Sequence, residues 1–146
     1  MAGYSGTALP QKLGIKEGAR VGVVRAPADF GRTMGVLPFG VVPRAVSAAS
    51  GVMDVIVCFV RTRKELGEVK GLKKKLGPAG GLWVAWPKKA SGLAAEVGEG
   101  EVREAGLGAG LVDNKVCAVD EIWSGLRFVY RLVDRLPKSA GKRQAR

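Results

Sequence analysis

The run DVIVCFV at residues 54–60 places the strongest constraint on the fold, because every position after its aspartate is apolar. A strand of this kind is typical of the centre of a parallel sheet, where helices cover both faces. Thr62 and Glu65 follow at the spacing of a helix capping box. The apolar face of that helix is predicted at Leu66, Val69, Leu72 and Leu76, with Gly77 and Pro78 at its end. We therefore expect a central strand followed by a crossover helix.

Strand and helix patterns alternate along the rest of the chain. We expect a first helix at residues 8–13, capped by Thr7 and ended by Gly14, and a weaker helix at residues 96–109. Strands are predicted at residues 20–25, 41–46, 82–86, 115–119 and 126–132, and Pro43 assigns the second of them to a sheet edge. The pattern predicts an α/β fold, a Rossmann-like three-layer sandwich with a mostly parallel sheet of about six strands and an antiparallel C-terminal strand. Trp83 and Trp86 should face opposite sides of their strand.

Length and charge indicate one folded domain with a basic surface. The chain has 146 residues, with 24 lysines and arginines against 13 acidic residues and a net charge of +11. We expect a single domain over residues 1–134, opening with a helical arm at residues 1–14, and a disordered basic tail over residues 135–146. The excess charge favours a polyanionic partner or serves solubility alone. No signal sequence or membrane span is predicted, so we expect a cytoplasmic protein.

The composition excludes several kinds of catalytic site. The chain has no histidine and only two cysteines, each within an apolar run. Histidine-activated nucleophiles and a four-ligand zinc site therefore cannot be built, and Cys58 and Cys117 are expected to be reduced and buried. Asp120 and Glu121 are neighbours at a strand end, so their side chains should point apart rather than form an acid–base pair. We predict no catalytic and no metal-binding residue.

Several segments carry a resemblance to known proteins. KLGIKEGARVGVVRAP, MDVIVCFVRTRKEL and LKKKLGPAGGLWVAWPKK together resemble a shortened class I S-adenosylmethionine-dependent methyltransferase. The YSGT start, the WPKKASG segment and the VDEIWSGL motif are similar to a small bacterial family to which no activity is assigned. The resemblance covers the chain to about Val133 and implies the methyltransferase-like fold.

The chain departs from the methyltransferase pattern where the cofactor would bind. The loop after the strand at residues 20–25 reads RAPADFG, where such enzymes carry a glycine-rich turn. The next strand ends at Ala45 and Val46, without the carboxylate that accepts the ribose hydroxyls. We therefore expect no cofactor in the usual pose and a non-catalytic or degenerate domain. The alternative is an S-adenosylmethionine-dependent methyltransferase with an atypical cofactor loop, in which Gly31 and Gly35 serve a displaced loop.

Basic residues gather where the predicted strands end, which is where open α/β sheets bind ligands. We predict an anion site on this rim for a phosphorylated ligand or RNA, with Trp123 as a flat face for a base. The rim consists of Arg25, Arg61, Arg63, Lys88, Lys89, Asp120, Glu121, Trp123 and Ser124. Two alternatives stay open. Asp120 and Glu121 pair with these cations in a structural ion network, or the basic tail and the face of Arg127 and Arg131 bind nucleic acid.

Overall fold

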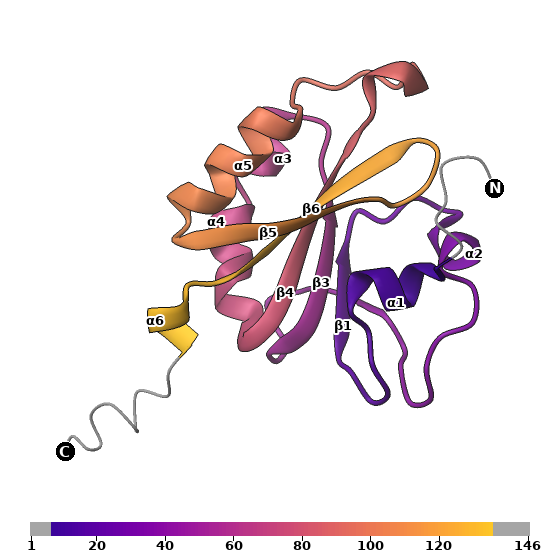
Figure 1. Cartoon of the computed structure of the whole chain (residues 1–146), viewed down its shortest axis with the longest axis vertical. Helices are drawn as coiled ribbons and strands as arrows, with labels where there is room; N and C mark the ends of the chain where they lie inside the picture. The colour runs from indigo at the N-terminus through magenta and orange to yellow at the C-terminus, as the bar shows by residue number, and fades with distance from the viewer. Residues whose placement is uncertain (1–6, 136–146) are drawn as a thin grey trace.

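A six-stranded sheet forms the centre of the computed structural model, which describes residues 7–135 (Figure 1). The spatial order is β2-β1-β3-β4-β6-β5. The strands are β1 (Val21–Val24), β2 (Arg44–Ala45), β3 (Met53–Phe59), β4 (Leu76–Pro87), β5 (Leu111–Ala118) and β6 (Trp123–Tyr130). The first four strands pair in parallel, and β6 is antiparallel to both β4 and β5. The predicted Rossmann-like fold is therefore confirmed, including its antiparallel C-terminal strand.

Helices pack on both faces of the sheet and make the molecule three-layered (Figure 1). One face is covered by α3 (Arg63–Leu66), α4 (Val69–Leu72) and α5 (Glu99–Gly108). The other face carries α1 (Leu9–Leu13) and α2 (Phe30–Met34). Three short elements complete the chain: the 3-10 turns η1 (Lys73–Lys75) and η2 (Lys89–Ser91), and α6 (Leu132–Arg135).

Strand β3 divides two hydrophobic cores, as its apolar sequence predicts. Ile56 and Cys58 face the core under α3, α4 and α5, whereas Val57 and Phe59 face the core under α1 and α2. All side chains of residues 55–60 are buried. The two tryptophans of β4 divide in the same way, with Trp83 in the α1 core and Trp86 in the α5 core. Both predictions are confirmed.

The structure corrects the predicted ends of the helices. The N-cap residue of α1 is Ala8 rather than Thr7, while Gly14 ends the helix in the left-handed conformation as expected. The helix predicted to reach Leu76 is divided into α3, α4 and η1, and Leu76 instead begins β4. Gly77 and Pro78 lie inside this strand, because Leu76 pairs with Met53 of β3 and extends the sheet in that direction.

The strand bounds also differ from the prediction. The strand expected at residues 41–46 is reduced to the two residues of β2, although it lies at the sheet edge as Pro43 indicated. Strands β5 and β6 begin earlier than expected, and Leu132 belongs to α6 rather than to the last strand. Residues 1–6 of the predicted arm and residues 136–146 of the predicted tail lie outside the described residues.

Candidate functional site

The topological switch point of the sheet lies between β1 and β3. The chain leaves β1 for β2 on one side and returns to β3 on the other side. In open α/β sheets, ligands bind at this point, outside the carboxyl ends of the strands. Arg25 directly follows β1, Arg61 follows β3 and Lys88 directly follows β4. The parallel pairing therefore brings these three predicted rim residues to one edge of the sheet.

Arg25 closes the gap between the ends of β1 and β3 with its own side chain. Its Nε donates to the Phe59 carbonyl at 3.0 Å, and its two terminal nitrogens donate to the Glu68 carboxylate at 3.1 and 2.8 Å. Glu65 lies 3.5 Å from Nε on the same helical segment. The hydrogen bond to Glu68 raises the pKa of Arg25 above its ordinary value. The guanidinium is thus neutralised within the chain.

The backbone of Arg25 is as unusual as its contacts. Its φ of 56° lies in the left-handed region, and no other non-glycine residue among residues 7–135 has a positive φ. This conformation costs an ordinary residue roughly 1–2 kcal/mol. Strain of this kind persists where surrounding contacts over-determine the residue, and it is concentrated at functional sites. Here the bonds to Phe59 and Glu68 hold Arg25 in place.

Aromatic rings fill the sheet edge behind Arg25. The Phe59 ring packs edge-on against both Phe30 and Trp123, with centroid distances of 5.0 Å in each pair. Trp123 is only 7% exposed and belongs to the α1 core. The proposed flat face for a base is therefore covered, and Trp123 is a core residue rather than a stacking platform.

Two further rim cations are bonded to backbone carbonyls of neighbouring loops. Arg61 Nε donates to the Ala94 carbonyl at 2.9 Å. Lys88 Nζ donates to the Asp120 carbonyl at 2.8 Å, and the Lys88 amide donates to the Ile122 carbonyl at 2.7 Å. These bonds join the segments that follow β3 and β4 to the loop before α5 and to the β5–β6 turn. Both side chains therefore serve as structural ties at the rim.

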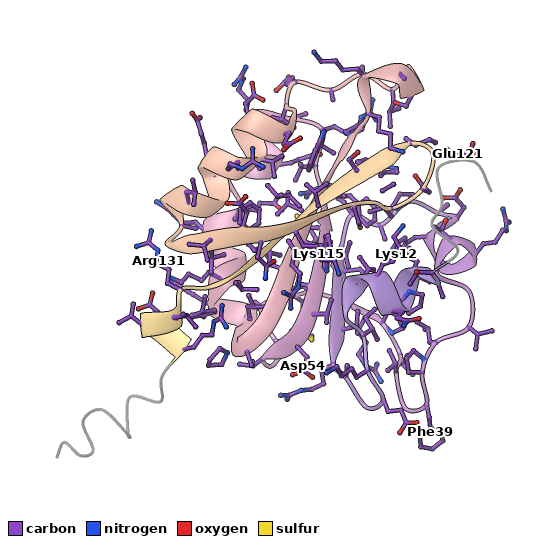
Figure 2. The ribbon with its side chains drawn as sticks, viewed as in Figure 1. Lys12, Phe39, Asp54, Lys115, Glu121 and Arg131 are labelled. Atoms are coloured by element: carbon purple, nitrogen blue, oxygen red, sulfur yellow. The ribbon has the colours of Figure 1, made fainter. Side chains whose placement is uncertain are left out.

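The predicted ion network between Asp120, Glu121 and the rim cations does not form among the described residues. Asp120 accepts hydrogen bonds from the amides of Ile122 and Trp123, both at 2.8 Å, and so shapes the β5–β6 turn. Glu121 is exposed at the tip of that turn, as Figure 2 shows. Ser124 is half-buried and pairs with Trp86 and Ala118 in the sheet. The acidic partners at the rim are Glu65 and Glu68 instead.

Arg63 and Lys89 are the rim cations whose side chains form neither an ion pair nor a hydrogen bond with the described residues, whereas Arg25 is ion-paired and Arg61 and Lys88 are hydrogen-bonded. Lys89 lines a cavity of about 580 Å³ between the end of β4 and the start of α5. Glu96 and Glu101 line the same cavity, and the pKa of Glu101 is lowered first by the hydrogen bond from the Gly98 amide and to a smaller degree by the charges of Arg63 and Lys89. The cavity is therefore of mixed charge rather than purely basic.

The residues at the switch point do not fit an adenosyl cofactor in the usual pose. After Arg25, the chain continues through Ala26, Pro27 and Ala28, so no glycine turn faces the strand ends. Beyond β2, Ser47 and Ser50 hydrogen-bond each other, and no carboxylate stands where ribose hydroxyls would be bound. Gly31 and Gly35 lie within α2 and at its end. The Arg25 side chain lies at the switch point of the sheet, where it is bonded to Phe59 and Glu68.

Glu68 is the residue that the sequence analysis missed. It was not assigned a role, because its bond to Arg25 joins the end of β1 to the segment between α3 and α4, 43 residues away. The available signal was its spacing from Glu65, since residues three apart share one face of a helical turn. Both carboxylates point from that face toward Arg25.

Other kinds of site find no support within residues 7–135. These residues hold no cluster of histidine, cysteine, aspartate or glutamate that would bind a metal ion. Within the same range, no helix has the length and apolar character needed to span a membrane.

Comparisons with known proteins agree on the fold. No family model matches the sequence, and no curated protein matches it either. Among solved structures, a fibrillarin from Aeropyrum pernix with natively bound S-adenosyl-L-methionine is similar, with a TM-score of 0.54 and 14% identity over 87% of this chain and 70% of that one. An S-adenosylmethionine-dependent methyltransferase from Aquifex aeolicus gives a TM-score of 0.54 with 17% identity, over 81% of this chain and 85% of its own.

A third similar structure is magnesium protoporphyrin IX methyltransferase from Synechocystis PCC 6803 with bound S-adenosylhomocysteine. Its TM-score is 0.53 with 11% identity, over 79% of this chain and 75% of that one. At such identities, the likeness establishes the methyltransferase-like architecture that the sequence predicted. It does not establish an activity, because one fold hosts many functions and the site decides among them.

Proposed function

We propose that this chain is a binding domain of the methyltransferase fold that does not hold S-adenosylmethionine as the similar structures do, and that its ligand is an anion. The contacts of the Arg25 side chain support the first part of the proposal, that the chain does not hold S-adenosylmethionine in the usual pose. This side chain spans the ends of β1 and β3 and is bonded to Phe59 and Glu68. A cofactor at the switch point would have to break these bonds and leave Glu65 and Glu68 without their cation.

The anionic ligand is supported by charge. The chain carries a net charge of +11, which favours a negatively charged partner. At the rim, Arg25, Arg61 and Lys88 are bonded within the protein, so the prediction of an anion site there narrows to Arg63 and Lys89. A phosphorylated ligand is the class that arginine and lysine together bind well.

Calorimetric titration tests the cofactor part of this proposal. The full chain is titrated with S-adenosylmethionine and S-adenosylhomocysteine, with the Aquifex aeolicus methyltransferase as the positive control. We expect no binding heat for this chain up to about 1 mM ligand, a concentration at which even weak complexes of about 4 kcal/mol are half-formed. Micromolar binding to the wild type would overturn the proposal. Binding gained only by Arg25→Gly would support it, because that change opens the switch point.

A second candidate is S-adenosylmethionine-dependent methyl transfer with a displaced cofactor, and the likeness to cofactor-bound structures favours it. In this case the cofactor lies against α2 and its flanking loops rather than beside Arg25. Amide chemical shifts distinguish the two candidates. Addition of S-adenosylhomocysteine would move the amides of Ala26, Ala28 and Gly35 if a displaced pose exists, and would leave them unmoved if the first candidate is correct.

A further inference from the structure

Arg127 is a half-buried cation without a carboxylate partner among the described residues. It extends from β6 across β4 on the face that carries α1, and a Cβ atom at Gly81 would lie 2.9 Å from its Cζ. The absence of a side chain at Gly81 therefore allows the guanidinium to lie flat on the sheet. Its hydrogen-bond partner in the described chain is Asn114 Oδ1, at 3.5 Å from Nη1.

The charges around Arg127 are of the same sign. Burial lowers the pKa of Arg127, and the nearby Arg135 lowers it further. Arg25 and Arg103 differ, because the hydrogen bonds that they donate to glutamate or aspartate raise their pKa values. Arg127 is thus a cation that the fold buries in part without compensating its charge. Such a group is costly unless an anion from outside pairs with it.

A second cation is aimed at the same face by a local irregularity of β5. Lys115 lies directly opposite Arg127 in the register of the two strands. The register shifts between Asp113 and Lys115, so Asn114 is a bulge that turns Lys115 onto the face of Arg127. Like charges directly opposite each other destabilise a strand pair. The bulge therefore places Lys115 and Arg127 opposite each other as a repulsive pair.

A cavity of about 510 Å³ adjoins Lys115, between α1 and β5. Lys12 and Lys115 line it together with Thr7, Gln11 and Cys117, and its lining contains no acidic residue. Lys12 Nζ donates to the Ala118 carbonyl at 3.0 Å, which places α1 beside the edge strand. In the view of Figure 2, Lys12, Lys115 and Arg131 lie in a row across the molecule. The cavity wall therefore combines two cations and other polar side chains with the apolar residues Val116 and Ala118.

We propose that a small phosphorylated molecule binds with its phosphate groups in the cavity between α1 and β5, beside Lys12 and Lys115, and against Arg127, which lies opposite Lys115 on β6. Guanidinium binds phosphate in a bidentate manner, and the two ammonium groups add point charges. Trp83, directly opposite Arg127 on β4, is fully buried and donates to the Leu13 carbonyl, so it offers no ring on which a nucleic-acid base stacks. The surface therefore suits a compact phosphate group better than a single strand of RNA.

Calorimetric titration with pyrophosphate at low ionic strength tests this site. We expect the wild-type chain to bind, and expect Lys115→Gln and Arg127→Gln each to weaken binding at least about tenfold, the loss of one charge-assisted contact. Lys74→Gln is the matched control, because it removes one exposed charge from η1, after α4. Its affinity should stay within about twofold of the wild type, since a single distant charge is largely screened.

Thermal unfolding provides a second readout. Pyrophosphate should raise the melting temperature of the wild type and of Lys74→Gln, but not that of Arg127→Gln. Without ligand, Arg127→Gln should melt no lower than the wild type, because a like-charge pair is removed. A lower melting temperature together with an unchanged response to pyrophosphate would overturn the site and make Arg127 a structural residue.

Three further outcomes would also contradict the proposal. The first is no binding of pyrophosphate at millimolar concentration. The second is a loss of affinity in Lys74→Gln equal to that in Lys115→Gln and Arg127→Gln, which would indicate that pyrophosphate is attracted by the net charge of the chain rather than by one site. The third is binding of a single-stranded RNA 12-mer without binding of pyrophosphate, which would assign the surface to nucleic acid. Loss of pyrophosphate binding only in Arg63→Gln combined with Lys89→Gln would place the ligand at the rim. That result would preserve the proposed function while overturning this site.

Discussion

Arg25 has a left-handed backbone conformation, which favours glycine, but its contacts require the arginine side chain. Its φ of 56° is strained, whereas its bonds to Phe59 and Glu68 stabilise the ends of two strands. The sequence predicted that a cation would lie at this edge of the sheet. It did not predict the partners, because Glu65 and Glu68 reach Arg25 only after α3 and α4 have packed on the sheet. The rim residues were thus predictable from strand ends, and their bonding was not.

The strain at Arg25 predicts an inverted order of stability for two substitutions. Arg25→Ala and Arg25→Gly both lose the ion pair, but alanine keeps the unfavourable left-handed backbone. We expect Arg25→Gly to be more stable than Arg25→Ala by about 1 kcal/mol, although glycine is the less stable residue at ordinary positions. Urea unfolding of both variants measures the difference. A more stable Arg25→Ala would show that φ at this position is not constrained in solution.

Gly106 is required by the packing of α5 against the sheet. A Cβ atom at this position would overlap the ring of Phe128, which is fully buried in the α5 core. We expect Gly106→Ala to lower the free energy of unfolding by about 1–3 kcal/mol through overpacking. Gly108→Ala is the matched control, because nothing lies within 4 Å of its Cβ and alanine favours helix. Denaturant unfolding should show the control at or slightly above wild-type stability.

At the scale of elements, the segment between β3 and β4 shows where sequence patterns fail. The apolar spacing predicted one continuous helix, and Leu66, Val69 and Leu72 do share one core. Gly67 nevertheless ends α3, and the glycine-rich start of β4 has the composition of a turn. The start of β4 is nevertheless a strand because it pairs with β3, since strand formation depends on neighbouring strands more than on intrinsic preference. Tertiary context of this kind cannot be read from local composition.

The capping box at the start of α3 was predicted correctly and provides a test of its contribution. Thr62 Oγ1 accepts from the Glu65 amide at 3.0 Å, and Glu65 Oε1 accepts from the amides of Thr62 and Arg61. We expect Thr62→Ala to cost about 1 kcal/mol of stability, and Thr62→Ser to retain most of it because the hydroxyl acceptor remains. Urea unfolding compares the three proteins. Equal losses in the two variants would assign the effect to the threonine methyl group.

Glu101 at the start of α5 predicts a pH dependence. Its carboxylate accepts from the Gly98 amide at 2.9 Å, and this bond lowers its pKa below the ordinary value of 4.5. A lowered folded-state pKa contributes stability that is fully present above pH 4.5 and is lost as the pH falls through the folded-state value. We expect wild type to exceed Glu101→Gln in stability near neutral pH, and the difference to disappear in acid, where both side chains are neutral. Thermal unfolding from pH 3 to pH 7 measures it.

The whole sheet was the most predictable feature of the molecule. The alternation of strands and helices predicted a mostly parallel sheet, the apolar residues of β3 placed that strand at the centre, and Pro43 placed β2 at the edge. The distribution of surface charge was not predictable, because positions such as Lys115 depend on a bulge that leaves no signature in the sequence. The basic excess of the chain therefore indicated an anionic partner without locating it. The fold determines which cations are neutralised internally and which, like Arg127, are left for a ligand.

The two cysteines report how the molecule opens as a whole. Burial raises the pKa of Cys58 on central strand β3 to about 12, and it raises that of the half-buried Cys117 on edge strand β5 as well. Thiolates are the reactive species, so native protein at pH 8 should be alkylated at Cys117 first and at Cys58 only through unfolding. Peptide mass spectrometry after timed iodoacetamide exposure measures both rates, with guanidinium-unfolded protein as the control. Low urea should accelerate Cys58 labelling as steeply as global unfolding, because β3 is bordered on both sides by paired strands. Comparable rates at the two sites in native buffer would mean that the sheet opens at its centre without unfolding the rest.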